Sequence, residues 1–248
     1  MHQYSEFAYI YDELMNEVDY IAWIEYLEQI MAIENASVKN ILELACGTGN
    51  ITLPLAIKGY DIVGMDISEE MLNVAVKKSK EIGVDIVYLE QDIRNLEFEV
   101  DGLDCVLCCC DGFNYILKDK HLKNIFTKVY YQMKEEGIFI FDISSYYKLT
   151  KILGDNTYGE EKENITYMWQ NFFNYENNTL DMDLVFFVKD ENGKYDKFNE
   201  YHTQRAYKEN EIANILREVG FSKIKTYGDF SFEKPKEDTE RITFVCKK

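Results

Sequence analysis

The feature that most constrains the fold is the stretch of residues 41–50, where an apolar run meets a turn of small residues. Small side chains alternate along that turn, at Ala45, Gly47 and Gly49, and a helical pattern begins directly after it. Glycine adopts backbone torsions that other residues avoid, and it lets a ligand approach the main chain. The first turn of a helix also presents unpaired N–H groups. The stretch therefore predicts a strand–turn–helix unit with a ligand site at the turn, although many folds contain such a turn.

Alternating strand and helix patterns continue through the first 143 residues. Residues 7–33 carry apolar side chains at helical spacing and predict one or two helices. Alternation of this kind predicts a mostly parallel sheet with helices on both faces, and right-handed crossovers make the sheet doubly wound. The expected strands are residues 38–44, 60–65, 84–89, 103–109 and 138–143, and the expected helices between them are residues 50–58, 68–83 and 119–133.

The alternation then breaks, and three long strands take the place of the next helix. Asn177 and Asn178 join the first two of these strands, and residues 190–193 join the second to the third with hairpin chemistry. We expect one domain, residues 1–248, with an inserted three-stranded antiparallel sheet in residues 160–206 that covers the open edge of the pocket. The inserted strands are residues 165–175, 180–188 and 195–206, followed by a helix at 209–219 and strands at 223–227 and 241–246.

The composition limits the partners of the chain. Acidic residues outnumber basic ones by 45 to 27, and the formal net charge is −18. A surface this negative repels phosphate backbones, so nucleic acid is not an expected partner. The first residues lack the pattern of a signal peptide, and the longest apolar run, residues 103–110, is interrupted by Asp104. We therefore expect a cytoplasmic protein without a membrane partner.

Four cysteines lie close together, at Cys105, Cys108, Cys109 and Cys110. They contain one C-x-x-C pattern, but no second cysteine or histidine pair follows at the spacing of a zinc site. The run is also typical of a buried strand, where cysteine is common. We therefore expect these cysteines to be structural and the protein to hold no metal.

Acidic side chains mark the ends of the first expected strands. Glu43 precedes the turn and suits a ligand with an ammonium group, whereas a dinucleotide fingerprint needs glycine at the position of Thr52. Asp66 ends the second strand, where a carboxylate can accept hydrogen bonds from both hydroxyls of a ribose. Asp92 follows the third strand, where it can meet an adenine amino group. Together these acids indicate a nucleoside ligand that carries an amine.

With these residues in place, the chain resembles the class I S-adenosylmethionine-dependent methyltransferases. The resemblance implies a seven-stranded sheet with its last strand antiparallel, S-adenosylmethionine as cofactor, and methyl transfer to a nitrogen or oxygen of a small-molecule acceptor. The inserted sheet is similar to that of small-molecule N-methyltransferases of the glycine and amino-sugar type. One departure is Ala45, where the family usually has glycine. The matching segments are ILELACGTGN (41–50), VGMDISEEML (63–72), LEQDI (89–93), LDCVLCCCDGFNYI (103–116) and EEGIFIFDI (135–143).

The resemblance also implies which residues contact the cofactor. Glu43 would face the methionine ammonium group, and the turn with Ala45, Gly47 and Gly49 would pass beneath the cofactor. Asp66 would hold the ribose. The other implied contacts are Ile67 and Met71 against the adenine, Asp92 and Ile93 at the adenine edge, Cys109, Cys110 and Asp111 beside the sulfonium, and Tyr11 and Trp23 closing the site.

The catalytic residues are unknown, and the candidates are His202, Arg205 and Asn114. Asn114 follows a turn after the fourth strand, and His202 and Arg205 lie in the inserted sheet. His202, with an unperturbed pKa of about 6.5, could take the proton that the acceptor loses on methylation. Two alternatives remain open: an NAD-dependent oxidoreductase, against which Glu43 and Thr52 argue, and a non-catalytic S-adenosylmethionine-binding protein. The expected assembly is a monomer or a homodimer.

Overall fold

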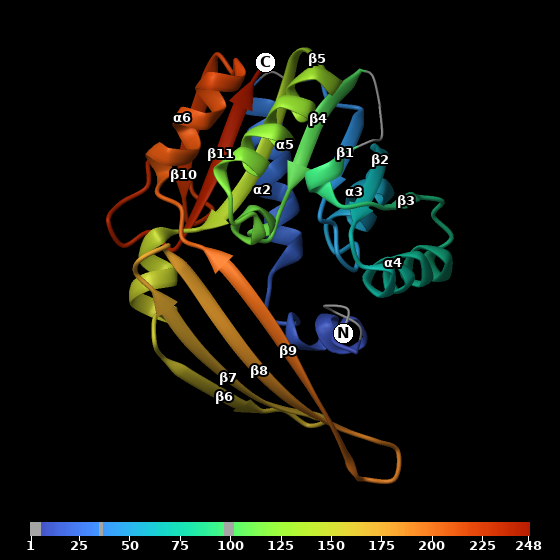
Figure 1. The fold of residues 1–248 in the computed structure, drawn as a ribbon. Coiled ribbons are helices and arrows are strands. Elements are labelled where there is room, and N and C mark those ends of the chain that lie inside the picture. Colours follow the sequence, from blue (N-terminus) through green and yellow to red (C-terminus); the bar gives the residue numbers. More distant parts are fainter. Residues whose placement is uncertain (1–5, 35–36, 97–101) are drawn as a thin grey trace.

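A seven-stranded sheet forms the centre of the computed structural model, which describes residues 6–34, 37–96 and 102–248 (Figure 1). In this part of the chain, β11 runs antiparallel to both of its neighbours, and the other strands run parallel to one another. The expected sheet with an antiparallel last strand is confirmed. Its strand order is β10 (Lys223–Gly228), β11 (Arg241–Lys247), β5 (Met133–Ser144), β4 (Leu103–Cys108), β1 (Asn40–Leu44), β2 (Asp61–Asp66) and β3 (Val87–Glu90).

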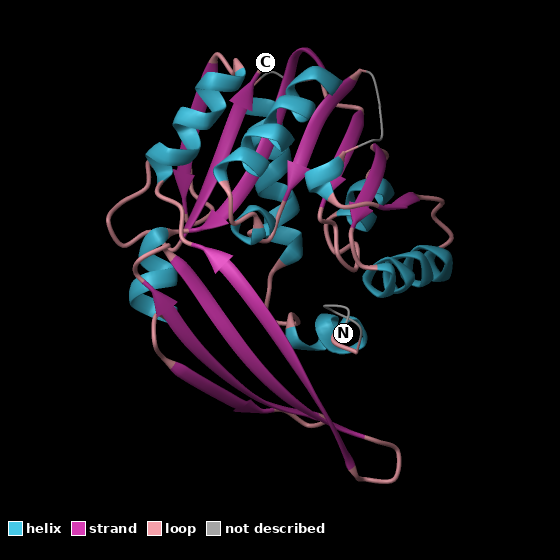
Figure 2. Ribbon diagram, viewed as in Figure 1, coloured by secondary structure: helices cyan, strands magenta, loops and turns pink. Residues whose placement is uncertain are grey.

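Helices cover both faces of this sheet (Figure 2). Neighbouring residues of a strand point to opposite faces, so Ile41 packs in one hydrophobic core and Leu42 in the other. The same holds for Ile140 and Phe141 on β5. The doubly wound arrangement is therefore confirmed. One core contains side chains of α2 (Tyr20–Ile33) and α3 (Thr52–Ile57), and the other contains side chains of α5 (Asp119–Gln132) and α6 (Glu209–Val219).

Helix α4 (Glu69–Ile82) begins directly beyond the end of β2. The Ser68 side chain caps it by accepting a hydrogen bond from the Met71 N–H at 3.2 Å, and Gly83 ends it in a left-handed conformation. This cap fixes the start of α4 next to Asp66. Among the helices of the described residues, none is both long and apolar enough to span a membrane.

The inserted sheet has four strands in the described residues, so the expectation of three was wrong by one. The additional strand, β6, is short and exposed along its whole length and contains Gly159. It lacks the apolar alternation that predicts a strand and forms because β7 offers it an edge to pair with. The four antiparallel strands are β6 (Thr157–Glu161), β7 (Ile165–Asn174), β8 (Thr179–Lys189) and β9 (Tyr195–Arg205).

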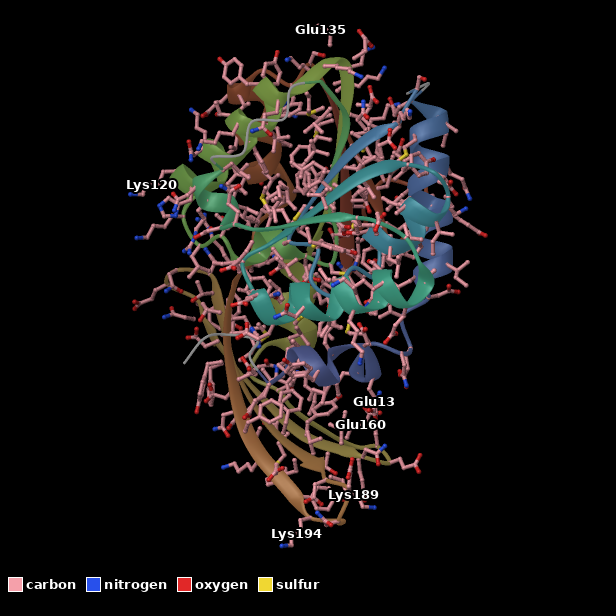
Figure 3. The ribbon with its side chains drawn as sticks, turned by 90° about the vertical axis from the view of Figure 1, so that its right-hand side faces the viewer. Glu13, Lys120, Glu135, Glu160, Lys189 and Lys194 are labelled. Carbon is pink, nitrogen blue, oxygen red and sulfur yellow. The ribbon has the colours of Figure 1, made fainter. Side chains whose placement is uncertain are left out.

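The short helix α1 (Ala8–Leu14) lies between the inserted sheet and the core (Figures 1 and 3). One end of the inner face of the inserted sheet packs against α1 through Ile10, Ile165 and Phe186. The other end packs against the π-helical turn η3 (Lys148–Leu153), where Leu149 joins a cluster with residues of β7 and β8. The inserted sheet thus approaches the carboxyl ends of the core strands, with α1 in between.

Candidate active site

A small cavity lies at the carboxyl ends of β1 and β4. These two strands are neighbours, and the order of the sheet reverses between them, which is where open α/β sheets bind ligands. The cavity measures about 40 Å³. Of the residues implied by the resemblance, Tyr11, Glu43, Ala45, Gly47, Cys109 and Cys110 line it, together with Tyr20, Cys46, Thr48, Asn50 and Ile51.

The turn after β1 is held in left-handed torsions at Ala45 (φ 54°), Gly47 (φ 54°) and Gly49 (φ 77°). A Cβ atom added to Gly47 would meet nothing within 4 Å, so open space lies next to this residue. A Cβ atom on Gly49 would lie 2.9 Å from the Tyr88 hydroxyl. Gly47 is therefore suited to pass beneath a ligand, whereas Gly49 is required for packing inside the protein.

Glu43 is the buried acid of the cavity, with 2% of its surface exposed. The Thr52 hydroxyl donates a hydrogen bond to it, which explains why threonine stands at that position. Burial raises the pKa of Glu43 to about 8, with a further contribution from the charge of Asp66. A cationic ligand would stabilise the ionised form of this buried carboxyl group, because the ligand charge would compensate for the lost hydration.

Asp66 occupies the expected position at the end of β2. It accepts hydrogen bonds from the N–H groups of Gly47 at 2.8 Å and Ser68 at 2.9 Å. Burial raises its pKa. The neighbouring Ile67 is 54% exposed and Met71 is 3% exposed, so Ile67 can still be covered by a ligand whereas Met71 belongs mainly to the protein interior.

Asp92 lies farther along the same edge, as the cap of the short turn η1 (Ile93–Asn95). The Arg94 guanidinium binds both of its oxygens, at 2.8 Å from Nε to Oδ2 and 2.9 Å to Oδ1. Burial raises the pKa of Asp92, but these contacts outweigh burial and lower it. The side chain of Ile93 is buried in the core, so the Ile93 contact to the adenine would come from its main chain.

Tyr20 lines the cavity in a position that the resemblance implied for Trp23. Its hydroxyl is buried and lies close to the side chains of Asn50 and Tyr11. Trp23 does not line the cavity; it packs on Phe230 with ring centroids 4.7 Å apart and lies under the Arg241 guanidinium. Both aromatic residues belong to the first turn of α2, so a helical pattern could not decide which of them faces the cavity.

Asp111 follows β4 and belongs to a buried cluster of charges. Arg241 donates hydrogen bonds to Asp111, at 2.9 Å, and to Asp142 on β5. Gln204 of the inserted strand β9 donates to the other oxygen of Asp111 at 2.8 Å. Burial raises the pKa of Asp111, but the Arg241 charge outweighs it and lowers that pKa. Asp111 therefore links the core to the inserted sheet.

The three acceptor candidates lie in different surroundings. Asn114, in the turn η2 (Gly112–Tyr115), is fully buried and binds the main chain of Ser144 and Arg205. The Arg205 guanidinium binds Asp119 at 2.8 Å at the start of α5. Both side chains therefore brace the fold. His202 alone of the three lies on the inner face of the inserted sheet, 6.0 Å from Phe7 of the α1 region between ring centroids, and burial lowers its pKa to about 4.

Comparison with known proteins identifies the family. Residues 41–137 match the methyltransferase domain model. The chain is 35% identical to a Geobacillus sp. (strain WCH70) protein named "Putative methyltransferase", over 99% of both chains. It is 37% identical to an S-adenosylmethionine-dependent methyltransferase structure from Clostridium acetobutylicum ATCC 824, with a TM-score of 0.89 and 98% of both chains covered. A glycine/sarcosine N-methyltransferase of Halorhodospira halochloris is 25% identical over 88% of this chain and 79% of its own.

The Geobacillus and Clostridium matches cover 99% and 98% of this chain and place it among methyltransferases, apart from NAD-dependent oxidoreductases. This agrees with the sequence, in which Glu43 precedes the glycine turn and Thr52 stands where a dinucleotide fingerprint needs glycine. The protein belongs to the S-adenosylmethionine-dependent methyltransferases and uses S-adenosylmethionine as its cofactor.

Proposed function

We propose that the cavity beside Glu43 and Tyr20 receives the methionine end of S-adenosylmethionine. Glu43 binds the ammonium group, and the buried Tyr20 hydroxyl donates a hydrogen bond to the carboxylate of the methionine. Asp66 accepts hydrogen bonds from the ribose hydroxyls. One carboxylate oxygen of Asp92 accepts a hydrogen bond from the adenine amino group, while Arg94 keeps the other oxygen. The buried acids suit a cofactor whose sulfonium and ammonium groups are positive.

We further propose that the acceptor is a small molecule bound between α1, η2 and the inner face of the inserted sheet. The observation that carries this proposal is the Gln204–Asp111 hydrogen bond. It joins β9 to the end of β4, so the inner face of β9 lies next to the carboxyl ends of the core strands. His202 lies on the same face as Gln204, two residues away along a strand whose side chains alternate.

The cofactor supplies a methyl group that is already activated by its positive sulfur. The residues of this chain have to align the acceptor with it and exclude water, and alignment can supply on the order of 7–11 kcal/mol in the best cases. His202 is neutral at physiological pH because burial lowers its pKa to about 4. That pKa makes it a weak proton acceptor, but its neutral imidazole can accept a hydrogen bond from an amine or a hydroxyl group and so align the acceptor. A relative that methylates glycine and sarcosine supports nitrogen as the methylated atom.

His202→Ala is expected to lower methyl transfer about 10²-fold, because a misplaced acceptor typically costs about that much. Transfer of tritium from methyl-labelled S-adenosylmethionine to glycine, sarcosine and a panel of small amines and alcohols measures it. The S-adenosylhomocysteine affinity should stay within a few fold. Tyr201→Ala is the control, because Tyr201 is the next residue on β9 and is 62% exposed on the outer face. Full turnover in His202→Ala would contradict this role.

A further inference from the structure

Helix α1 lies between the inserted sheet and the turn after β1. Its residue Asp12 binds the side chains of Thr48 and Asn50 in that turn. We propose that Asp12 is a positioning residue that holds α1 closed over the bound cofactor, as part of a latch formed by Asp12, Thr48, Asn50 and Lys78. The inference rests on the proposed cofactor site. It gives the N-terminal helix a role in the order of binding and release.

The Asp12 side chain binds three residues of the core. Its carboxylate accepts hydrogen bonds from the Thr48 hydroxyl at 2.6 Å, the Asn50 amide at 2.9 Å and the Lys78 ammonium group at 2.7 Å. Lys78 also donates to the Asn50 side chain. Although burial raises the pKa of Asp12, the hydrogen bonds from Lys78 and Thr48 outweigh burial and lower it. The latch is therefore charged at neutral pH.

Two members of the latch are also walls of the cofactor cavity. Thr48 and Asn50 line it, and so does Tyr11, the residue next to Asp12 on α1. Any movement of α1 that breaks the Asp12 contacts therefore also moves Tyr11 away from the cavity. The Asp12 contacts are therefore intact when Tyr11 covers the cavity and broken when it does not.

The cavity leaves little room for the methionine end of the cofactor while α1 is in this position. It measures about 40 Å³, which holds only a few water-sized groups, since one water needs about 10–15 Å³ of such volume. The strands around it belong to the packed core, whereas α1 is a short helix that packs on the inserted sheet and on α4. Helix α1 is therefore the element that has to move when the cofactor binds, and the latch opposes that movement.

The contact of α1 with the inserted sheet couples the two halves of the site. Ile10 packs against Ile165 and Phe186 of the inserted sheet, and Phe7 lies 6.0 Å from His202 between ring centroids. When the latch closes on the turn after β1, it therefore also fixes the position of Phe7 next to His202. Closing after both ligands have bound excludes water from the reacting groups.

Hydrogen exchange of the free protein tests the latch without any ligand. Asp12→Ala is expected to speed the exchange of the amides in residues 8–14 about tenfold, because charge-assisted hydrogen bonds are lost and opening becomes easier. Exchange in the core strands should not change. Glu13→Ala is the matched control, since it removes the same charge from a neighbouring exposed position on α1 (Figure 3).

Stopped-flow binding of S-adenosylhomocysteine then separates this inference from the proposed function. In Asp12→Ala, the association and dissociation rates should both rise about fivefold or more, a pattern that simple damage to the site does not produce. Lys78→Met should reproduce it, and the double variant should add little. Failure of the wild type to bind would contradict the proposed site. Unchanged exchange in residues 8–14 of both single variants would overturn the latch.

Discussion

Glu43→Gln is expected to raise the free energy of unfolding relative to the wild type at pH 8 and to weaken cofactor binding. Burial raises the pKa of Glu43 to about 8 in the folded protein, against 4.5 for a freely exposed glutamate. Between these values the folded state holds a proton that the unfolded state releases. The wild type therefore loses stability as the pH rises from about 5 to about 8, by up to about 1.4 kcal/mol for each pH unit.

Glutamine keeps the size of the side chain and can still accept the hydrogen bond from Thr52, but it does not titrate. The difference in unfolding free energy between variant and wild type should thus grow from pH 5 to pH 8 and then level off, as measured by urea denaturation. Affinity for S-adenosylhomocysteine should fall about tenfold or more, because a charged partner of the ammonium group is lost. A pH-independent difference would contradict the raised pKa of Glu43.

Arg241→Met should cause the largest loss of stability of any substitution considered. The Arg241 side chain is 16% exposed and neutralises Asp111 and Asp142, whose side chains are 18% and 4% exposed. Removing it takes the hydrogen-bonded counter-charge away from two buried carboxylates, which typically costs about 3–5 kcal/mol. Urea denaturation at pH 7 measures this loss. It should be accompanied by poor methyl transfer, because Asp111 also holds Gln204 of the inserted sheet.

A second substitution tests the cause of this loss. Asp142→Asn in the Arg241→Met background removes one of the uncompensated charges and should restore part of the stability. Arg217→Met is the control, because Arg217 is exposed on α6 and donates a hydrogen bond to Asn214; its effect should stay within about 0.5 kcal/mol. A similar loss in both arginine variants would show that the buried charge cluster is not the reason.

The sequence predicted those parts of the protein that depend on local patterns. The core strands, the antiparallel insertion and the cap of α4 follow from periodicity and from residues such as Ser68 and Gly83. Glu43 and Asp66 were found because the carboxyl ends of neighbouring parallel strands meet at one edge of a sheet. Their placement in one region of the structure needed no information beyond strand order.

Other features depend on contacts between distant residues, which a pattern along the chain does not contain. Asp12 and Lys78 are 66 positions apart, and Asp111 and Arg241 are 130 positions apart. The choice between Tyr20 and Trp23 depends on how α2 is rotated against the sheet. The strand β6 depends on the edge that β7 provides. Each of these was settled by tertiary packing.

Calorimetric titration of S-adenosylhomocysteine into the wild type and Asp66→Ala decides whether the carboxyl ends of β1 and β2 bind S-adenosylmethionine. Asp61→Ala, at the opposite and exposed end of the same strand, is the control. The proposed site predicts one ligand per chain for the wild type and the control. It predicts a loss of about tenfold or more for Asp66→Ala, since a charge-assisted contact contributes about 1.5–3 kcal/mol. Equal affinities in all three proteins would contradict the assignment of the site.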